Sequence, residues 1–115
     1  MVGEEAVETI SRWFQVTRVC HLVLPDGWFG RPYDNQHRLT HLQARPHKLL
    51  MELDEQLLLI FTEIATVRLE ASELILTDFQ QFVFDWQGYG DLLPHVAVYR
   101  QGTVKLVPPM GTTIL

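Results

Sequence analysis

Residues 48–62 read KLLMELDEQLLLIFT, and this stretch decides the fold class of the 115-residue chain. Large apolar side chains at positions 49, 51 and 53 alternate with their neighbours, which is typical of a strand with one buried face. Asp54, Glu55 and Gln56 then predict a turn. The continuous apolar run that follows, at 57–62, is typical of a central strand. The stretch therefore predicts two successive strands joined by a short turn.

The strand pattern continues downstream. Further strands are expected on either side of a turn at 71–72. Three aromatic residues line one face of another strand, where we expect them to form part of the core: Phe82, Phe84 and Trp86. Residues 95–100 and 103–107 flank Gln101-Gly102, and a two-residue loop with glycine second predicts a β-hairpin.

Upstream of residue 48 the pattern is more mixed. Residues 4–14 predict a short helix, because their apolar side chains recur on one helical face: Ala6, Val7, Ile10, Trp13 and Phe14. Residues 16–24 predict a strand that ends at a turn begun by Pro25. Residues 37–45 fit either an edge strand or a helical turn, since Leu39 and Leu42 lie three positions apart.

Together these elements predict one mainly β domain over residues 1–115. The expected architecture is a single antiparallel β-barrel or sandwich of about eight short strands, with a short N-terminal helix within 1–14 and a C-terminal tail at 108–115. A chain of this length can bury one real core. Because 47% of its residues are apolar and its strands leave open edges, we expect a homo-oligomer, most simply a dimer.

Composition argues against several classes of function. The formal net charge of −5 disfavours binding to nucleic acid or to a membrane surface. The longest purely apolar run, at 57–61, is too short to span a bilayer. A single cysteine allows no internal disulfide, and the N-terminus has no signal-peptide pattern, so the expected location is the cytoplasm.

The densest functional pattern is the loop at 25–35, PDGWFGRPYDN. Its glycines and prolines predict turns, and its aromatic residues carry more apolar area than an idle linker needs. Residues 28–48 also hold four basic residues against one acid. We therefore expect the contact site, for a small anionic ligand or a protein partner, to lie at Trp28, Arg31, Tyr33, His37, Arg38 and His41.

The histidines and the cysteine predict no metal site and no cofactor. His37 and His41 are four apart, which would place them on one face of a helix or a strand. No cysteine pair or HExxH motif accompanies them. Cys20 precedes His21, but neighbours in a strand point to opposite faces, so Cys20 would need a different histidine as its base. We expect Cys20 to be a buried, inert thiol.

Two functions remain open. The first is a non-enzymatic binding or interaction module whose contact site is the loop at 25–35. The second is a small enzyme with a pocket under that loop, in which Arg31 fixes an anionic substrate and His37 or His41 acts as acid or base. The sequence shows no assembled catalytic set, which favours the first. The enzyme would require a concave site with a histidine hydrogen-bonded to another polar group near Arg31.

Overall fold

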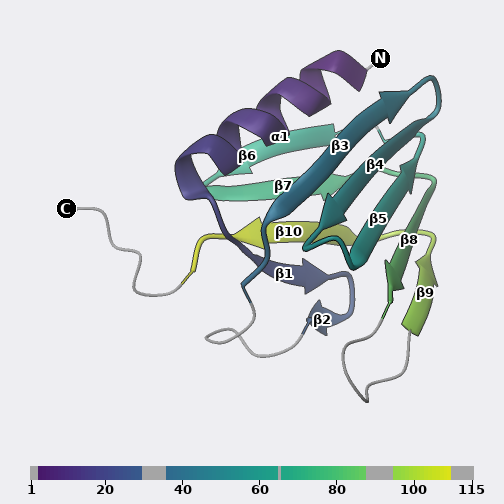
Figure 1. The fold of residues 1–115 in the computed structure, drawn as a ribbon. Coiled ribbons are helices and arrows are strands. Elements are labelled where there is room, and N and C mark those ends of the chain that lie inside the picture. Colours follow the sequence, from purple (N-terminus) through teal and green to yellow (C-terminus); the bar gives the residue numbers. More distant parts are fainter. Residues whose placement is uncertain (1–2, 30–35, 65, 88–94, 110–115) are drawn as a thin grey trace.

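The computed structural model describes residues 3–29, 36–64, 66–87 and 95–109, which form two antiparallel sheets and one helix (Figure 1). The helix, α1, spans Gly3–Thr17. The described strands are β1 (His21–Leu24), β2 (Gly27–Trp28), β3 (Leu39–Arg45), β4 (Lys48–Leu53), β5 (Leu57–Thr62), β6 (Thr66–Glu70), β7 (Glu73–Thr77), β8 (Gln81–Trp86), β9 (His95–Tyr99) and β10 (Thr103–Val107). The prediction of a mainly β fold with a short N-terminal helix is confirmed. The two separate sheets fit the sandwich and not the closed barrel.

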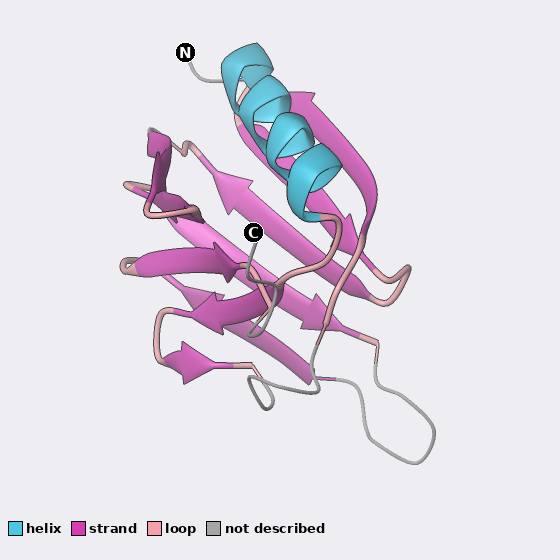
Figure 2. Cartoon of the chain, turned by 90° about the vertical axis from the view of Figure 1, so that its left-hand side faces the viewer, coloured by secondary structure: helices cyan, strands magenta, loops and turns pink. Residues whose placement is uncertain are grey.

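The two sheets have five strands each. Sheet 1 has the order β2-β1-β10-β7-β6, and sheet 2 has the order β3-β4-β5-β8-β9. In Figure 1 sheet 1 lies to the left of sheet 2, and Figure 2 shows the helix alongside strands at one edge of the sheets. Helix α1 contacts β3 and β6, which are edge strands of different sheets. The helix therefore bridges the two sheets along this side.

The stretch that predicted the fold forms β4 and β5 in the middle of sheet 2. Burial alternates strictly along both strands, so Leu49, Met51 and Leu53 face the interior. The turn between the strands contains Asp54 and Glu55, whose φ angles are 57° and 58°. Left-handed residues of this kind give a turn the twist that antiparallel strands require. Both predicted strands and their turn are confirmed.

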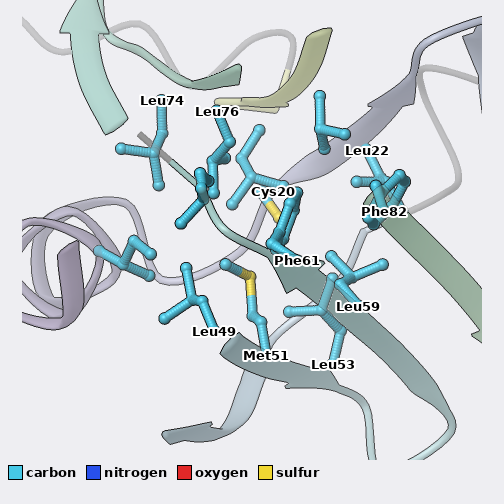
Figure 3. Close-up of a cluster of buried hydrophobic side chains, with 14 of the residues drawn as sticks. Cys20, Leu22, Leu49, Met51, Leu53, Leu59, Phe61, Leu74, Leu76 and Phe82 are labelled. Carbon is cyan, nitrogen blue, oxygen red and sulfur yellow. The ribbon is translucent and has the colours of Figure 1, made fainter. Parts of the chain in front are cut away.

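The core lies between the sheets and beneath the helix (Figure 3). Side chains from both sheets point toward one another there, including Leu22, Leu49, Met51, Leu59, Leu74 and Leu76. Phe61 stacks on Phe82 with their ring centroids 4.7 Å apart. Phe82 and Phe84 are fully buried and Trp86 packs against the cluster, so the predicted core role of these aromatics is confirmed.

The first helix is longer than predicted, and the strand after it is shorter. Helix α1 continues through Thr17, and β1 begins at His21 and not at residue 16. Arg18 adopts a left-handed φ of 71°, and its N–H donates to the carbonyl of Phe14 at 2.9 Å, which ends the helix. Val16 consequently lies on the helix and is 84% exposed.

The predicted hairpin around Gln101-Gly102 is wrong. Strand β9 pairs with β8 in sheet 2, whereas β10 pairs with β1 and β7 in sheet 1. The short loop therefore carries the chain from one sheet to the other. Gly102 has a φ of 120°, and a Cβ at this position would lie 2.7 Å from the Cβ of Pro25. Glycine is thus needed here for conformation and space, at a crossing between sheets.

Candidate functional site

The structure describes only part of the predicted loop site. Arg31 and Tyr33 lie outside the described residues, and so does the side chain of Trp28. The backbone of Trp28 belongs to β2 and pairs with Val23 of β1. Phe29 packs inward, with its ring centroid 5.0 Å from that of Phe84. An anion site centred on Arg31 therefore stays a prediction.

The two histidines of the predicted site lie on different sides of the chain. His37 is 5% exposed, whereas His41 is exposed on the outer side of sheet 2. The pairing of β3 with β4 shifts register between Leu39 and His41, which is a β-bulge. Side chains alternate along a strand, so one inserted residue reverses the face of everything after it. The expectation that the two histidines share a face is wrong for this reason.

His37 forms a close pair with Asp54. Its Nδ1 lies 2.7 Å from Oδ2 of the carboxylate, and the backbone N–H of Arg38 donates to Oδ1 at 2.9 Å. The N–H of Asp54 donates back to the carbonyl of Arg38 at 2.9 Å. These bonds fasten the chain that enters β3 to the β4–β5 turn, while the side chain of Arg38 is exposed. In the sequence Asp54 predicts only a turn, and no spacing signal connects it to His37.

Cys20 lies opposite His37 in an isolated antiparallel bridge, with backbone N–H to carbonyl distances of 2.9 and 2.8 Å. Directly opposed residues share a face, so the fold supplies the different histidine that Cys20 would need. However, burial raises the pKa of the Cys20 thiol far above its ordinary value, and the charge of Asp54 raises it further. The thiol stays protonated, so this cluster has no nucleophilic thiolate. The prediction that Cys20 is buried is confirmed.

A different candidate site lies on the outer side of sheet 2. Strand register sets three rows of outward side chains across the sheet. The middle row is mostly apolar, and we call it the apolar row: Gln43, Leu50, Ile60, Val83 and Val98. On one side of it lies the basic row: Arg45, Lys48, Thr62 and Gln81. On the other side lies the acidic row: His41, Glu52, Leu58, Asp85 and Val96.

The apolar row is accessible to solvent. Val98 is 53% exposed at the β9 edge, and Val96 beside it is 58% exposed. The apolar residues on the inner strands of the row keep intermediate exposure: Leu50, Ile60 and Val83. Helix α1 and sheet 1 cover the opposite face of sheet 2, and no element of the described chain lies over this one. Strand β5 is therefore apolar on both faces although one face is uncovered.

A cavity of about 290 Å³ opens at the C-terminal end of α1, beside the β6–β7 turn. Its lining residues are Arg12, Trp13, Val16, Thr17, Leu69 and Ser72. The indole N–H of Trp13 donates to the carbonyl of Ser72 at 3.0 Å. Arg12 pairs with Glu8 on the exposed side of the helix. None of the lining residues is a histidine or an acid, so the cavity has no acid–base pair for catalysis.

Among residues 3–29, 36–64, 66–87 and 95–109, no group of three or more His, Cys, Asp or Glu side chains is placed to hold a metal ion. The described helix is too short and too polar to cross a membrane. Comparison of the chain with protein-family models, with curated proteins and with solved structures finds no match.

Proposed function

We propose that the protein is a non-enzymatic interaction module whose contact surface is the outer face of sheet 2. The observation that supports this proposal is the apolar row, which runs through the centre of the sheet and ends in Val98 at 53% exposure. The core does not require these side chains. The inward residues of the same strands fill it, among them Leu49, Leu59 and Phe84.

Removing such a row from water is energetically favourable. Each Å² of apolar surface that becomes buried contributes about 25 cal/mol. The row is also contiguous, because Ile60 pairs with Leu50 on one side and with Val83 on the other. Contiguous apolar patches bordered by polar residues are typical of protein–protein contacts, whereas single exposed apolar residues are ordinary.

The edge of sheet 2 supports the same proposal. Edge strands are commonly protected by lysine, by proline or by a covering element. Strand β9 instead presents Val96 and Val98 outward. Within the described residues, β9 pairs on one side only, with β8.

The described geometry gives the enzyme alternative no comparable support. That alternative requires His37 or His41 as an acid or base near Arg31. His37 is enclosed and bonded to Asp54, and its Nε2 is buried without a hydrogen-bond partner in the described chain. His41 faces the other way, on the acidic row. The loop at 25–35 stays a predicted contact site.

A photo-cross-linking experiment tests the proposal. Benzoylphenylalanine is placed at Val96, on the contact surface, or at Glu4, an exposed residue in the first turn of α1. Each protein is irradiated both pure and in an extract of the cells that make it. We expect protein adducts from position 96 and only background from position 4. If position 96 gave no adduct in either sample, the outer face of sheet 2 would not be a contact surface.

A further inference from the structure

We infer that the partner is a second copy of this chain, packed face to face through sheet 2 about a two-fold axis that runs across the strands. This inference rests on the proposed function and adds the identity and the orientation of the partner. Packed sheets keep their strand directions nearly aligned. A two-fold axis that brings one face onto itself lies in the interface, so it runs either across the strands or along them.

An axis across the strands makes the two faces complementary. It places each strand over the same strand of the partner and exchanges the outer rows. The apolar row then meets itself, and Ile60 packs near Ile60 of the partner subunit. The basic row meets the acidic row, so Lys48 lies over Glu52 of the partner subunit, and the reverse contact forms by symmetry. Opposite charges flank an apolar centre on both sides, as in specific interfaces.

An axis along the strands makes the same faces repel each other. It places β4 over β8 of the partner and keeps each row over its own counterpart. Glu52 would then face Asp85 of the partner subunit, and the basic row would face the partner's basic row. Like charges brought together at an interface are unfavourable. The charge pattern of sheet 2 therefore favours the axis across the strands.

Pairing of two β9 edges into one continuous sheet is a third arrangement. It would use the free edge of the strand and the exposed side chains of Val96 and Val98. It would leave Leu50 and Ile60 in water, because they lie on inner strands of the sheet. It would also make no use of the charges at positions 48 and 52. Face-to-face packing accounts for all three rows, and edge pairing does not.

The area of the face fits a dimer of weak affinity. Five strands spaced about 4.8 Å apart, with five residues rising about 3.3 Å each, give a face of about 24 Å by 17 Å, or about 400 Å² per subunit. The two faces together come to about 800 Å², which is below the size of stable specific interfaces and in the range of weak, transient ones. We therefore expect a reversible dimer with a dissociation constant in the micromolar range.

Charge exchange between positions 48 and 52 tests the geometry. Sedimentation equilibrium is measured for the wild type, for Lys48→Glu, for Glu52→Lys and for an equimolar mixture of the two variants. We expect each variant alone to dimerise roughly 25-fold more weakly, since two symmetry-related contacts change sign and each contributes on the order of five-fold. The mixture should recover the wild-type affinity as a heterodimer, because one chain then carries acids at both positions and the other carries bases.

The other outcomes contradict the inference in distinguishable ways. Melting temperatures are measured to check that the variants stay folded. This control is needed because Thr40 Oγ1 donates to Glu52 Oε1 at 2.9 Å, and Glu52→Lys removes that bond. A Glu52→Lys variant that dimerised more tightly would point to the axis along the strands. A dimer that responds to neither variant would point to edge pairing. A wild type that stays monomeric while position 96 cross-links to other proteins would overturn the inference and keep the proposed function.

Discussion

The two sheets bury similar side chains inward but differ on their outer faces. On sheet 1 the outward residues of β6, β7 and β10 are mostly polar and several of them are paired, although the same face also carries Val23, Ile75 and Val107. Arg68 Nε lies 2.7 Å from Glu70 Oε2, and Thr66 Oγ1 donates to Asp78 Oδ2 at 2.7 Å. On sheet 2 the corresponding middle row is apolar, and the charges stand in separate rows on either side of it.

This difference shows that the fold does not require an apolar outer face. Sheet 1 forms a five-stranded sheet with mostly polar side chains outward on β6, β7 and β10, and Ile75, which is buried on that face, lies between Arg68 and Lys105 in the register. The long aliphatic stems of such residues can cover an apolar neighbour. In the apolar row of sheet 2, by contrast, Ile60 lies between Leu50 and Val83 in the register and Val83 lies between Ile60 and Val98, which is why we assign a contact to this row.

The largest expected effect comes from comparing a charge placed on the outer face of sheet 2 with a charge placed on the outer face of sheet 1. We expect Val83→Glu, on sheet 2, to weaken dimerisation by at least about 100-fold, because two carboxylates would be buried without partners near the axis. Thr103→Glu, on the outer face of sheet 1, should leave dimerisation unchanged. Sedimentation equilibrium measures both, and circular dichroism checks the fold. Equal effects of the two variants would remove the distinction between the faces.

A smaller effect, on the free energy of unfolding, is expected for two histidine–carboxylate pairs. One pair is part-buried and the other is exposed. His37 and Asp54 form a largely enclosed pair, whereas His47 and Glu63 form an exposed one with Nδ1 2.5 Å from Oε1. Asp54→Ala should lower the free energy of unfolding by about 2 kcal/mol, because it leaves the enclosed Nδ1 of His37 without its partner and removes the bond to the backbone N–H of Arg38. Glu63→Ala should cost about 0.5 kcal/mol or less.

Urea unfolding of the two variants measures this difference at a fixed protein concentration. If Glu63→Ala cost as much as Asp54→Ala, the pair at His37 would have no special structural role. Dimerisation should change little in either variant, since neither carboxylate belongs to the three rows.

The smallest expected effect is a loss of stability at alkaline pH that comes from Cys20. The thiol pKa is raised in the folded state, while an unfolded thiol ionises near about pH 8.5. The stabilisation is complete below that pH and is lost as the pH rises further, because the unfolded chain releases a proton that the folded chain keeps. Between pH 8 and 9.5 we expect the wild type to lose about 1 kcal/mol relative to Cys20→Ala.

Urea unfolding of both proteins across this pH range measures the loss. A thiol reagent should also leave the native protein unmodified and label it after unfolding. Rapid labelling of the native protein, or a stability difference that does not vary with pH, would show that Cys20 is not enclosed.

Local patterns in the sequence predicted much of sheet 2, because burial on one face leaves a period of two along β4 and β8 and because β5 is a continuous apolar run. Long-range features left no such signal. A two-residue loop with glycine second, as at Gln101-Gly102, is compatible with a hairpin and also with a crossing from one sheet to the other. The bulge before His41 reverses the face toward which the following side chains point, and no glycine or proline marks it in the sequence. His37, Asp54 and Cys20 come together only through tertiary pairing.

The apolar run at 57–62 shows where a sequence signal has two meanings. A strand that is apolar on both faces can be covered within its own domain or by another molecule. The sequence predicted a central strand, and β5 is the middle strand of sheet 2. Only the arrangement of the helix and sheet 1 on one side reveals that its outer face is uncovered in the described chain.

Isotope-filtered NMR on the wild-type protein tests the central claim most directly. A sample of equal parts ¹³C-labelled and unlabelled chain, at a concentration where sedimentation shows dimer, reports only contacts between copies. We expect intermolecular methyl NOEs that connect Ile60 and Val83 to Ile60 of the partner subunit and Val83 of the partner subunit. Intermolecular NOEs confined to Val96 and Val98, or found only on helix α1 or sheet 1, would contradict the claim that sheet 2 packs face to face.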